Sequence, residues 1–422
     1  MRERGEFVIA GSLSEKIIKC LIAFFVFLTM AASLGIAAKA EAGRIVDTSD
    51  ALYTYDEMTE DIALLTKNYP GKCSCEIIGH SVDGRNIYAV TVGNTNAPGS
   101  IFVESGTHAR EYINCMLTMY QIEEYLKHWN DEYAAGSTYG QILSRCNLVF
   151  VPMTNPDGVT FSQFGLDSIQ TPKVRQELAK ISKGCNIRRW KANARGVDLN
   201  RNYDCYFGAV NTKTGPSDAD FCGYQADSEP EVQAIEGLIQ SKSSWVGAVC
   251  FHSAESAVFY NVGDAAKPEV LSRSLEMARL AVSMNKYNLY MDSRGYSQPR
   301  GLLYHWLLIN RSIPTILIET CKGNSPQEYG EWAKLIRGNG NIPIQMCYFF
   351  GMDSALVSAK TNMSCSVWST PNSKNSANRV KYLPGGRLLD VYRSIITGED
   401  GKEYYRTKKG YYVLAKAVDL ME

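Results

Sequence analysis

The sequence predicts an α/β fold with a mixed, mostly parallel sheet that carries helices on both faces, followed by a small C-terminal β-barrel. Short apolar stretches alternate with longer stretches that have apolar residues at helical spacing, as far as about residue 350. After Gly351 the composition changes, and short aromatic stretches separated by turn clusters follow. Alternating strands and helices form a sheet covered on both faces, whose strands are apolar throughout.

The main domain is assigned to residues 43–355, and its elements follow from local signals. A helix is expected over 53–69, where apolar residues recur at helical spacing before a Pro-Gly stop. Further helices are expected over 112–125, 229–242, 268–286 and 326–337. Strands are expected over 75–79, 87–92, 101–104, 148–152, 245–251 and 316–318.

The C-terminal region is predicted to form a separate unit. Residues 356–366 are rich in Ser, Thr, Asn and Lys, which is typical of a linker. Residues 367–422 contain three strand-like stretches separated by turn clusters, a pattern typical of a small β-barrel. The alternative is an extension that packs on the main domain.

The first 42 residues are predicted to be a signal peptide or a membrane anchor. Residues 20–38 are predominantly apolar, Lys16 and Lys19 precede them, and a small-x-small sequence suited to cleavage follows at 38–40. The apolar run is also long enough to span a bilayer if it is retained. Either outcome places the remaining chain outside the membrane. Over the whole chain 44 basic residues balance 44 acidic ones, which argues against nucleic-acid binding.

The chain contains twelve cysteines, and eleven remain if residues 1–40 are removed. An odd number leaves at least one thiol unpaired or shared between chains. Cys205 and Cys222 flank a loop rich in Gly, Asn, Asp and Ser, and they are the pair expected to form a disulfide. No two cysteines have the C-x-x-C spacing, which argues against a zinc site made of cysteines.

Residues suited to metal binding and acid–base chemistry lie at the predicted strand ends. His108 and Glu111 follow one strand, three residues apart, so both can reach one metal ion. His252 ends a second strand and Glu319 a third. Two histidines and one carboxylate leave a fourth zinc position open for water, which is typical of catalytic zinc sites. A carboxylate directly after a buried strand, such as Glu319, needs a partner or a chemical role.

The chain resembles the zinc carboxypeptidases of the carboxypeptidase A/B family from residue 53 to about 350. Seven motifs occur in the order typical of that family. They are the opening helix at 53–69, the G-x-S-x-x-G-R-like segment at 79–85, Gly-Thr-His-Ala-Arg-Glu at 106–111, Asn-Pro-Asp-Gly at 155–158, Gly-Val-Asp-Leu-Asn-Arg-Asn at 196–202, Phe-His-Ser at 251–253 and Ile-Glu at 318–319. The resemblance implies the carboxypeptidase fold and hydrolysis of the peptide bond next to a C-terminal residue.

The resemblance also implies the metal ligands and the catalytic base. One zinc ion per chain would bind to His108, Glu111 and His252. Glu319 would take a proton from zinc-activated water and pass it to the leaving amine.

Three further residues are implied to contact the substrate. Arg110 would polarise the scissile carbonyl. Asn200 and Arg201 would hold the free C-terminal carboxylate, with Arg201 forming a bidentate pair. A fixed cation for that carboxylate is what makes such an enzyme an exopeptidase.

The chain departs from the family pattern at four positions. Lys191 stands where the family places an arginine that stabilises the oxyanion, and Arg188, Arg189 or Arg195 are alternatives for that role. Tyr296 matches the mobile tyrosine that covers the substrate only with a one-residue insertion. Tyr304 lies at the position that sets side-chain specificity. Arg300, close by in the sequence, is expected to meet an acidic group on the substrate.

Two segments, 190–196 and 252–255, resemble bacterial family members that cut the γ-D-glutamyl–diaminopimelate bond of peptidoglycan. The C-terminal region resembles a bacterial SH3-like domain, a common wall-binding appendage. The leading hypothesis is therefore a secreted, monomeric zinc metallocarboxypeptidase that acts on wall peptides and is extracellular or associated with the wall. The alternatives are a broad-specificity carboxypeptidase that scavenges peptides, and a wall-binding protein without activity.

Overall fold

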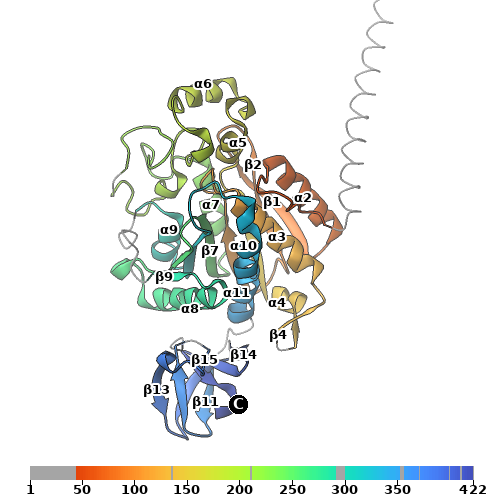
Figure 1. Cartoon of the computed structure of the whole chain (residues 1–422), viewed down its shortest axis with the longest axis vertical. Coiled ribbons are helices and arrows are strands. Elements are labelled where there is room, and N and C mark those ends of the chain that lie inside the picture. Colours follow the sequence, from red (N-terminus) through yellow and green to blue (C-terminus); the bar gives the residue numbers. More distant parts are fainter. Residues whose placement is uncertain are drawn as a thin grey trace, which may run out of the picture.

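The computed structural model describes residues 44–134, 136–209, 212–290, 300–351, 356–369, 371–398, 400–408 and 411–421. The segment predicted as a signal peptide or anchor lies outside these residues. Among the helices in the described ranges, none has both the length and the apolar character needed to cross a membrane. Figure 1 shows a large domain of strands and helices above a smaller one made of strands.

The main domain is built on one eight-stranded sheet with the order β1-β2-β6-β3-β7-β10-β8-β9. The central pairs β6–β3, β3–β7 and β7–β10 are parallel, as is β8–β9, while β1–β2, β2–β6 and β10–β8 are antiparallel. The mixed, mostly parallel sheet is therefore confirmed. The strand bounds are β1 Cys73–His80, β2 Asn86–Val92, β3 Gly99–Glu104, β6 Cys146–Val151, β7 Trp245–Ser253, β8 Ala257–Phe259, β9 Asn288–Tyr290 and β10 Thr315–Thr320.

The sheet separates two hydrophobic cores because successive side chains on a strand point to opposite faces. On β3, Ile101 and Val103 belong to one core and Phe102 to the other. The first core is covered by α2 Tyr55–Asn68, α3 Ile113–Lys127, α4 Tyr139–Arg145, α8 Pro268–Asn285, α10 Trp332–Asn339 and α11 Ile342–Gly351. The second is covered by α7 Pro230–Ser241 and α9 Leu303–Ile309 (Figure 1).

Short elements complete the main domain at two separate places, with α5 and α6 near its top in Figure 1 and β4 near its bottom. The helices α5 Pro156–Phe164 and α6 Pro172–Ile181 enclose a small core that contains Phe161, Leu178 and Trp190. A two-stranded sheet joins β4 Glu132–Ala134 to β5 Ser137–Thr138.

The helix expected over 326–337 begins later than predicted. A short 3-10 turn, Tyr329–Glu331, precedes α10, which begins at Trp332. The chain before it is held by Ser325, whose hydroxyl lies 2.8 Å from the hydroxyl of Ser253 at the end of β7. This tertiary contact has no counterpart in the local sequence pattern, so the pattern placed the helix start too early.

Cys205 and Cys222 are both free thiols, so the predicted disulfide is wrong. Cys205 lies in the second hydrophobic core, near the α9 residues Leu303 and Trp306. The thiol of Cys222 instead faces the carbonyl oxygen of Gly223, at 3.3 Å. Each sulfur is therefore satisfied by its own surroundings.

The C-terminal region forms an antiparallel seven-stranded sheet with the order β13-β12-β16-β15-β14-β11-β17. This arrangement is consistent with a small barrel-like domain. Its strands are β11 Leu356–Thr361, β12 Cys365–Trp368, β13 Arg379–Leu383, β14 Leu388–Thr397, β15 Glu403–Thr407, β16 Tyr412–Leu414 and β17 Val418–Leu420.

The stretch predicted as a linker, 356–366, is instead β11 and the start of β12. On β11, Ala359 and Thr361 are buried while Ser358 and Lys360 are exposed. This alternation is typical of a strand with one buried face. The prediction failed because the inward positions carry small or polar side chains that resemble linker composition.

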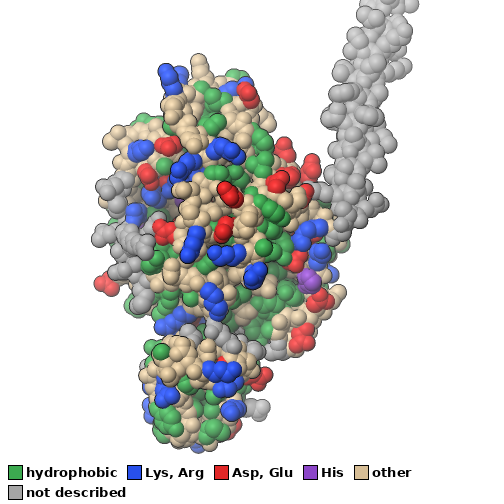
Figure 2. Space-filling view, in the orientation of Figure 1, with side chains coloured by type: hydrophobic (Ala, Val, Ile, Leu, Met, Phe, Trp, Pro, Cys, Tyr) green, Lys and Arg blue, Asp and Glu red, His purple; other side chains and the backbone are tan. Residues whose placement is uncertain are grey.

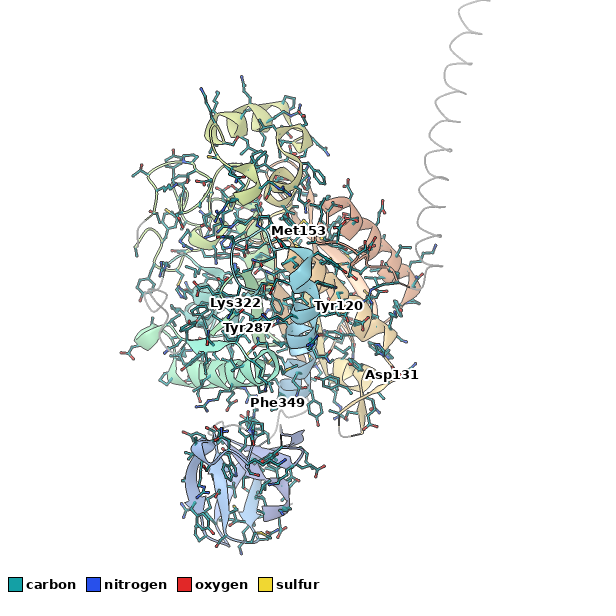
Figure 3. The ribbon with its side chains drawn as sticks, in the orientation of Figure 1. Tyr120, Asp131, Met153, Tyr287, Lys322 and Phe349 are labelled. Carbon is teal, nitrogen blue, oxygen red and sulfur yellow. The ribbon has the colours of Figure 1, made fainter. Side chains whose placement is uncertain are left out.

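The C-terminal domain is packed against the main domain through a buried arginine, Arg406 on β15. Its Nη1 lies 3.1 Å from Oε2 of Glu276 on α8. Its guanidinium covers the rings of Tyr392, at 4.1 Å, and Phe349, at 4.9 Å. Figure 3 places Phe349 at the end of α11 that faces the smaller domain. A second arginine, Arg273, donates to the same Glu276 oxygen at 2.9 Å.

Candidate metal and active site

The metal-binding candidates are brought together by the ends of neighbouring strands. His108 and Glu111 lie in a turn after β3, closed by a hydrogen bond from the Glu111 amide to the His108 carbonyl at 3.1 Å. The turn needs glycine at position 106, where φ is +71° and a Cβ would lie 2.7 Å from the Cys115 sulfur. His252 lies on β7, which runs parallel to β3, so the carboxyl ends of both strands meet at one edge of the sheet.

The three side chains form a compact, buried group whose potential ligand atoms all lie within 4.8 Å of one another. Nδ1 of His108 is 2.9 Å from Oε1 of Glu111 and 3.1 Å from Nδ1 of His252. Nδ1 of His252 is 3.2 Å from Oε2 of Glu111. Two imidazole nitrogens and one carboxylate converging on one point are a donor set suited to catalytic zinc.

The charges within this group stabilise one another. Burial opposes ionisation of Glu111, but the two imidazoles outweigh it and hold the pKa of Glu111 well below its usual range. Burial also opposes protonation of His252, yet Glu111 raises the pKa of His252 to about 9. Glu111 therefore stays ionised and favours a positive charge beside it, as a metal ligand should.

Asp198 connects the metal group to Lys191. Its Oδ1 lies 3.4 Å from Nε2 of His108, and its Oδ2 lies 3.1 Å from Nζ of Lys191. Burial disfavours its charge, but Lys191 and Arg201 together hold the pKa of Asp198 well below its usual range. A carboxylate behind a ligating histidine orients the ring and raises its basicity. Asp198 was not singled out in the sequence, although it stands inside the 196–202 motif.

Glu319 lies beside His252 because β10 and β7 are parallel and pair these two residues directly. Paired residues on neighbouring strands point to the same face of the sheet, so both side chains reach the same space. Burial and the nearby charge of Glu111 raise the pKa of Glu319 to about 7, against the opposing effects of His252 and Lys191. A carboxyl group with this pKa can accept and release a proton near neutral pH.

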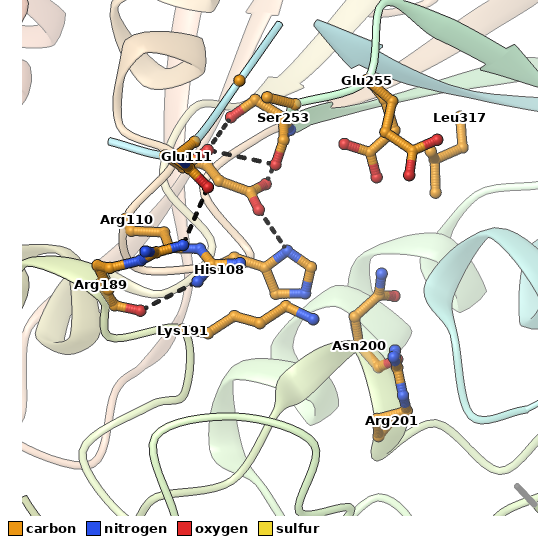
Figure 4. Close-up of a pocket in the computed structure, with 15 residues that line it drawn as sticks. His108, Arg110, Glu111, Arg189, Lys191, Asn200, Arg201, Ser253, Glu255 and Leu317 are labelled. Carbon is orange, nitrogen blue, oxygen red and sulfur yellow. Dashed lines mark hydrogen bonds and ion pairs between the residues drawn. The ribbon is translucent and has the colours of Figure 1, made fainter. Parts of the chain in front are cut away.

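His108, Glu111, Lys191 and Glu319 line one cavity of about 220 Å³, whereas His252 and Asp198 lie behind its lining. Figure 4 shows Arg110 and Arg189 on one side of His108, with Asn200 and Arg201 on the other. The predicted site residues that line it are His108, Arg110, Glu111, Lys191, Asn200, Arg201 and Glu319. It also contains residues that the sequence did not single out, among them Ser253, Glu255, Asn324 and Ser325.

Two predicted substrate contacts do not line this cavity. Tyr304 is buried in a separate core with Phe259 and Val262, and its hydroxyl donates to the Asn261 carbonyl at 3.0 Å. Arg300 also lies outside the lining, with its backbone amide donating to Nδ1 of His305 at 3.1 Å. The prediction for both rested on position in the chain, which does not show which way a side chain points. Tyr296 lies outside the described residues.

Comparison with known sequences identifies two groups of relatives. A family profile described as zinc carboxypeptidase matches residues 58–308. Carboxypeptidase A1 of Bos taurus is 27% identical over 213 residues, which cover 50% of this chain and 46% of that protein. Gamma-D-glutamyl-L-diamino acid endopeptidase 1 of Lysinibacillus sphaericus is 26% identical over 289 residues, which cover 66% of this chain and 68% of that protein. The matches thus span about half the length of the related carboxypeptidases A.

Solved structures share the fold at low sequence identity. Thrombin activatable fibrinolysis inhibitor has a TM-score of 0.57 at 18% identity, covering 70% of this chain and 74% of that chain. Carboxypeptidase A from Helicoverpa armigera has a TM-score of 0.54 at 18% identity, covering 77% of this chain and 79% of that chain. Both likenesses concern the fold alone.

Proposed function

The chain belongs to the zinc carboxypeptidase family, and we propose that it is a secreted bacterial metallocarboxypeptidase that acts on peptidoglycan stem peptides. One observation carries the proposed chemistry. His108 and Glu111 of the metal group, Glu319 and Arg201 line one small cavity, and His252 completes the metal group through its contact with Glu111 at 3.2 Å. The proposed metal-dependent hydrolysis uses the metal group and Glu319, and specificity for a chain end uses Arg201.

Zinc is the cofactor of this family, and the buried donor set of two histidines and one glutamate fits it. When bound, zinc supplies a Lewis acid that polarises a carbonyl group and lowers the pKa of water. Glu319 accepts the proton of the attacking water and then delivers it to the leaving amine nitrogen. Its pKa of about 7 suits both steps.

Arg110 and Lys191 supply positive charge at the reacting carbonyl. Both line the cavity, and Lys191 is oriented by its ion pair with Asp198 at 3.1 Å. We assign Arg110 to the carbonyl oxygen of the substrate, and Lys191 to the negative charge that develops on that oxygen. Fixed charge placed in advance at such a point is usually a large contribution to catalysis.

Asn200 and Arg201 bind the free carboxylate of the substrate. The Asn200 side chain is held by the Leu303 amide, which donates to Asn200 Oδ1 at 3.0 Å. Arg201 Nη1 donates to the Asn200 carbonyl at 2.8 Å, and Nη2 lies 3.4 Å from Asp220 Oδ1. These contacts fix the guanidinium, and its remaining N–H groups can form a charge-assisted pair with a carboxylate.

The wall substrate has two sources of support. The first is the similarity to a gamma-D-glutamyl-L-diamino acid endopeptidase. The second is a cleft of about 200 Å³ in the C-terminal domain, lined by three cations, one carboxylate and apolar side chains, among them Lys381, Arg387, Lys408, Asp390, Leu383 and Leu389. Figure 2 shows Lys and Arg side chains next to hydrophobic ones on this domain. Such a cleft suits a ligand with carboxylates and aliphatic carbon, as a wall peptide has. The N-terminal sequence supports export to an extracellular or wall-associated location.

The test uses peptide pairs that differ only at the C-terminus. A charged hydrogen bond to Arg201 is worth roughly 1.5–3 kcal/mol. Wild type should therefore cleave a free-acid peptide about ten to a hundred times faster than its amidated form, measured as kcat/KM. Arg201→Ala should remove most of this difference. Lys213→Ala, which alters an exposed side chain outside the cavity, is the control and should keep the difference. Equal cleavage of both forms by wild type would contradict the assignment of Arg201 to the substrate carboxylate and indicate an endopeptidase.

A second candidate, a broad-specificity carboxypeptidase that scavenges peptides, is favoured by the similarity to carboxypeptidase A1. Purified protein should be incubated with synthetic stem peptides and with ordinary peptides of equal length, and the products identified by mass. Faster cleavage of stem peptides supports the wall substrate, and equal rates support the scavenging enzyme. An inactive wall-binding protein is disfavoured because the predicted metal ligands and Glu319 are all present together.

A further inference from the structure

A second, larger groove adjoins the catalytic cavity. This groove has a volume of about 620 Å³ and shares Arg189, Asn324 and Ser325 with the cavity. Its outer part is lined by Asp50, Leu52, Tyr112, Arg188, Gln327 and Tyr329. Because the two spaces share lining residues, they are adjacent, with Arg189 at the boundary between them.

The groove lies on the acyl side of the bond to be cleaved. The proposed carboxylate clamp, Asn200 and Arg201, belongs to the cavity but not to the groove. Figure 4 shows the clamp on one side of His108, and Arg110 with Arg189 on the opposite side. A substrate whose C-terminal residue is held by the clamp therefore extends past Arg110 and Arg189 toward the groove.

The cations of the cavity differ in their partners. Lys191 and Arg201 each have a carboxylate within 3.4 Å. In the part of the chain that the structure describes, Arg110 and Arg189 contact only neutral oxygens. Arg110 Nη1 donates to the Arg189 carbonyl at 3.2 Å, and Arg189 Nη2 donates to Asn324 Oδ1 at 3.1 Å. Arg110 is already assigned to the scissile carbonyl, which leaves the Arg189 guanidinium without a role.

We propose that Arg189 binds a second carboxylate of the substrate, carried by the residue on the acyl side of the scissile bond. The inference rests on the proposed function and narrows its substrate class. A γ-linked glutamyl residue provides this carboxylate, because its α-carboxylate remains free when its side-chain carboxyl forms the scissile amide. The hydrogen bond that Arg189 donates to Asn324 Oδ1 holds one end of the guanidinium, and the other N–H groups present the fork that matches a carboxylate. Arg189 is a specificity-determining residue in this arrangement.

The test compares two peptides of the same shape that differ at one position, where a charged carboxylate in one is replaced by a neutral carboxamide in the other. One carries γ-D-glutamate with a free α-carboxylate, the other γ-D-isoglutamine with an α-carboxamide, and both end in the same free-acid residue. Wild type should favour the carboxylate peptide at least about tenfold in kcat/KM, since charged hydrogen bonds fall at the strong end of the range. Arg189→Gln should lower cleavage of the carboxylate peptide to the level of the carboxamide peptide and leave the latter within about twofold.

Two control variants sharpen the result. Arg189→Lys keeps the charge without the fork and should show an intermediate preference. Arg195→Gln removes an exposed arginine that lines neither space and should leave the preference unchanged. A measurement independent of turnover is the Kd of both peptides for the Glu319→Gln variant, with and without Arg189→Gln. The carboxylate peptide should bind more tightly only when Arg189 is present.

Three outcomes would overturn the proposal. Equal wild-type cleavage and binding of the two peptides would exclude a second carboxylate site. An equal loss on both peptides in Arg189→Gln would assign Arg189 to the reacting groups, in the manner of Lys191. A preference that persists in Arg189→Gln would assign the carboxylate to another cation. Failure of the proposed function is separate, since it would appear as no cleavage of any free-acid peptide, including ordinary α-linked ones.

Discussion

The catalytic cavity and the contact between the two domains both bury charged side chains, but they satisfy them in different ways. At the domain contact Glu276 accepts from Arg273 and Arg406 within 3.1 Å, and aromatic rings cover both guanidiniums. In the cavity, Glu319 and its neighbours face about 220 Å³ of open space. Burial of charge by itself therefore does not identify a functional site. Buried charge that faces a cavity indicates a functional site, whereas a closed cluster of buried charges holds two surfaces together.

The largest effect is expected from removing a metal ligand. His252→Ala should lose both zinc and activity, because two remaining ligands bind the metal weakly. Zinc content by elemental analysis and kcat/KM on a free-acid peptide check this. His128→Ala is the matched control, since this half-exposed histidine pairs with Asp131 at 2.6 Å far from the cavity. A His252→Ala protein with full zinc and full activity would show that His108, Glu111 and His252 are not the metal site.

The next largest effect is expected from removing the general base, Glu319. Glu319→Gln keeps the shape of the side chain but cannot accept the proton, so kcat should fall by about 10²-fold or more while zinc is retained. Glu331→Gln, which alters a surface carboxylate near Lys334, should leave kcat unchanged. Normal turnover by Glu319→Gln would show that Glu319 has a structural role, as Glu276 has at the domain contact.

The cluster of Glu276, Arg273 and Arg406 at the domain contact is tested by its effect on the unfolding free energy. Arg406→Ala leaves Glu276 with one arginine, and breaking a buried pair costs about 3–5 kcal/mol of unfolding free energy. Lys402→Ala removes an exposed partner of Asp400 and should cost about 1 kcal/mol or less. Denaturant unfolding measures both. The folded Arg406→Ala protein should keep its kcat/KM on small peptides, and a large loss there would show that the domain contact also supports the cavity.

The same contact predicts the effect of removing the C-terminal domain. A chain that ends near residue 355 would expose Phe349 and Phe350 on α11. We therefore expect it to be less stable and less soluble than the full chain, with activity per folded molecule preserved. Solubility and unfolding midpoint measure this, and a truncated chain as stable as the full one would show that the contact contributes little.

The smallest effect concerns a second closed cluster, around Glu231. Burial, followed by the charges of Asp157 and Glu229, raises the pKa of Glu231 to about 8. The folded protein thus keeps a proton that the unfolded chain loses above about pH 4.5. This contribution to stability is full below pH 4.5 and is lost as the pH rises to about 8. The change is at most about 1.4 kcal/mol per pH unit. Glu231→Gln should make the unfolding free energy less dependent on pH between 6 and 7, and an unchanged slope would contradict the assignment.

The sequence predicted the sheet and the metal site well because both depend on local patterns joined by a general rule. Apolar runs mark β3, β7 and β10, and residues that end neighbouring parallel strands meet at one edge. The convergence of His108, His252 and Glu319 follows from that rule without knowledge of the loops between them.

The features that the sequence did not show depend on packing between distant segments. Nothing near Arg406 or Glu276 in the chain indicates that they pair, since 130 positions separate them. Tyr304 was placed by its position in the chain, and its burial beside Phe259 depends on how α9 packs. The linker was misplaced because Ala359 and Thr361 are small or polar, yet they fill the inner face of β11.

The metal group has a consequence for folding as well as for catalysis. Every cysteine in the described ranges is a free thiol, so no disulfide ties those parts of the chain together. A metal held by Glu111 and His252 joins two points 141 positions apart. Closing so long a loop removes much of the freedom of the unfolded chain, and metal clips of this kind are expected to stabilise most when the loop is long. We therefore expect removal of the metal to lower the unfolding free energy as well as to abolish activity.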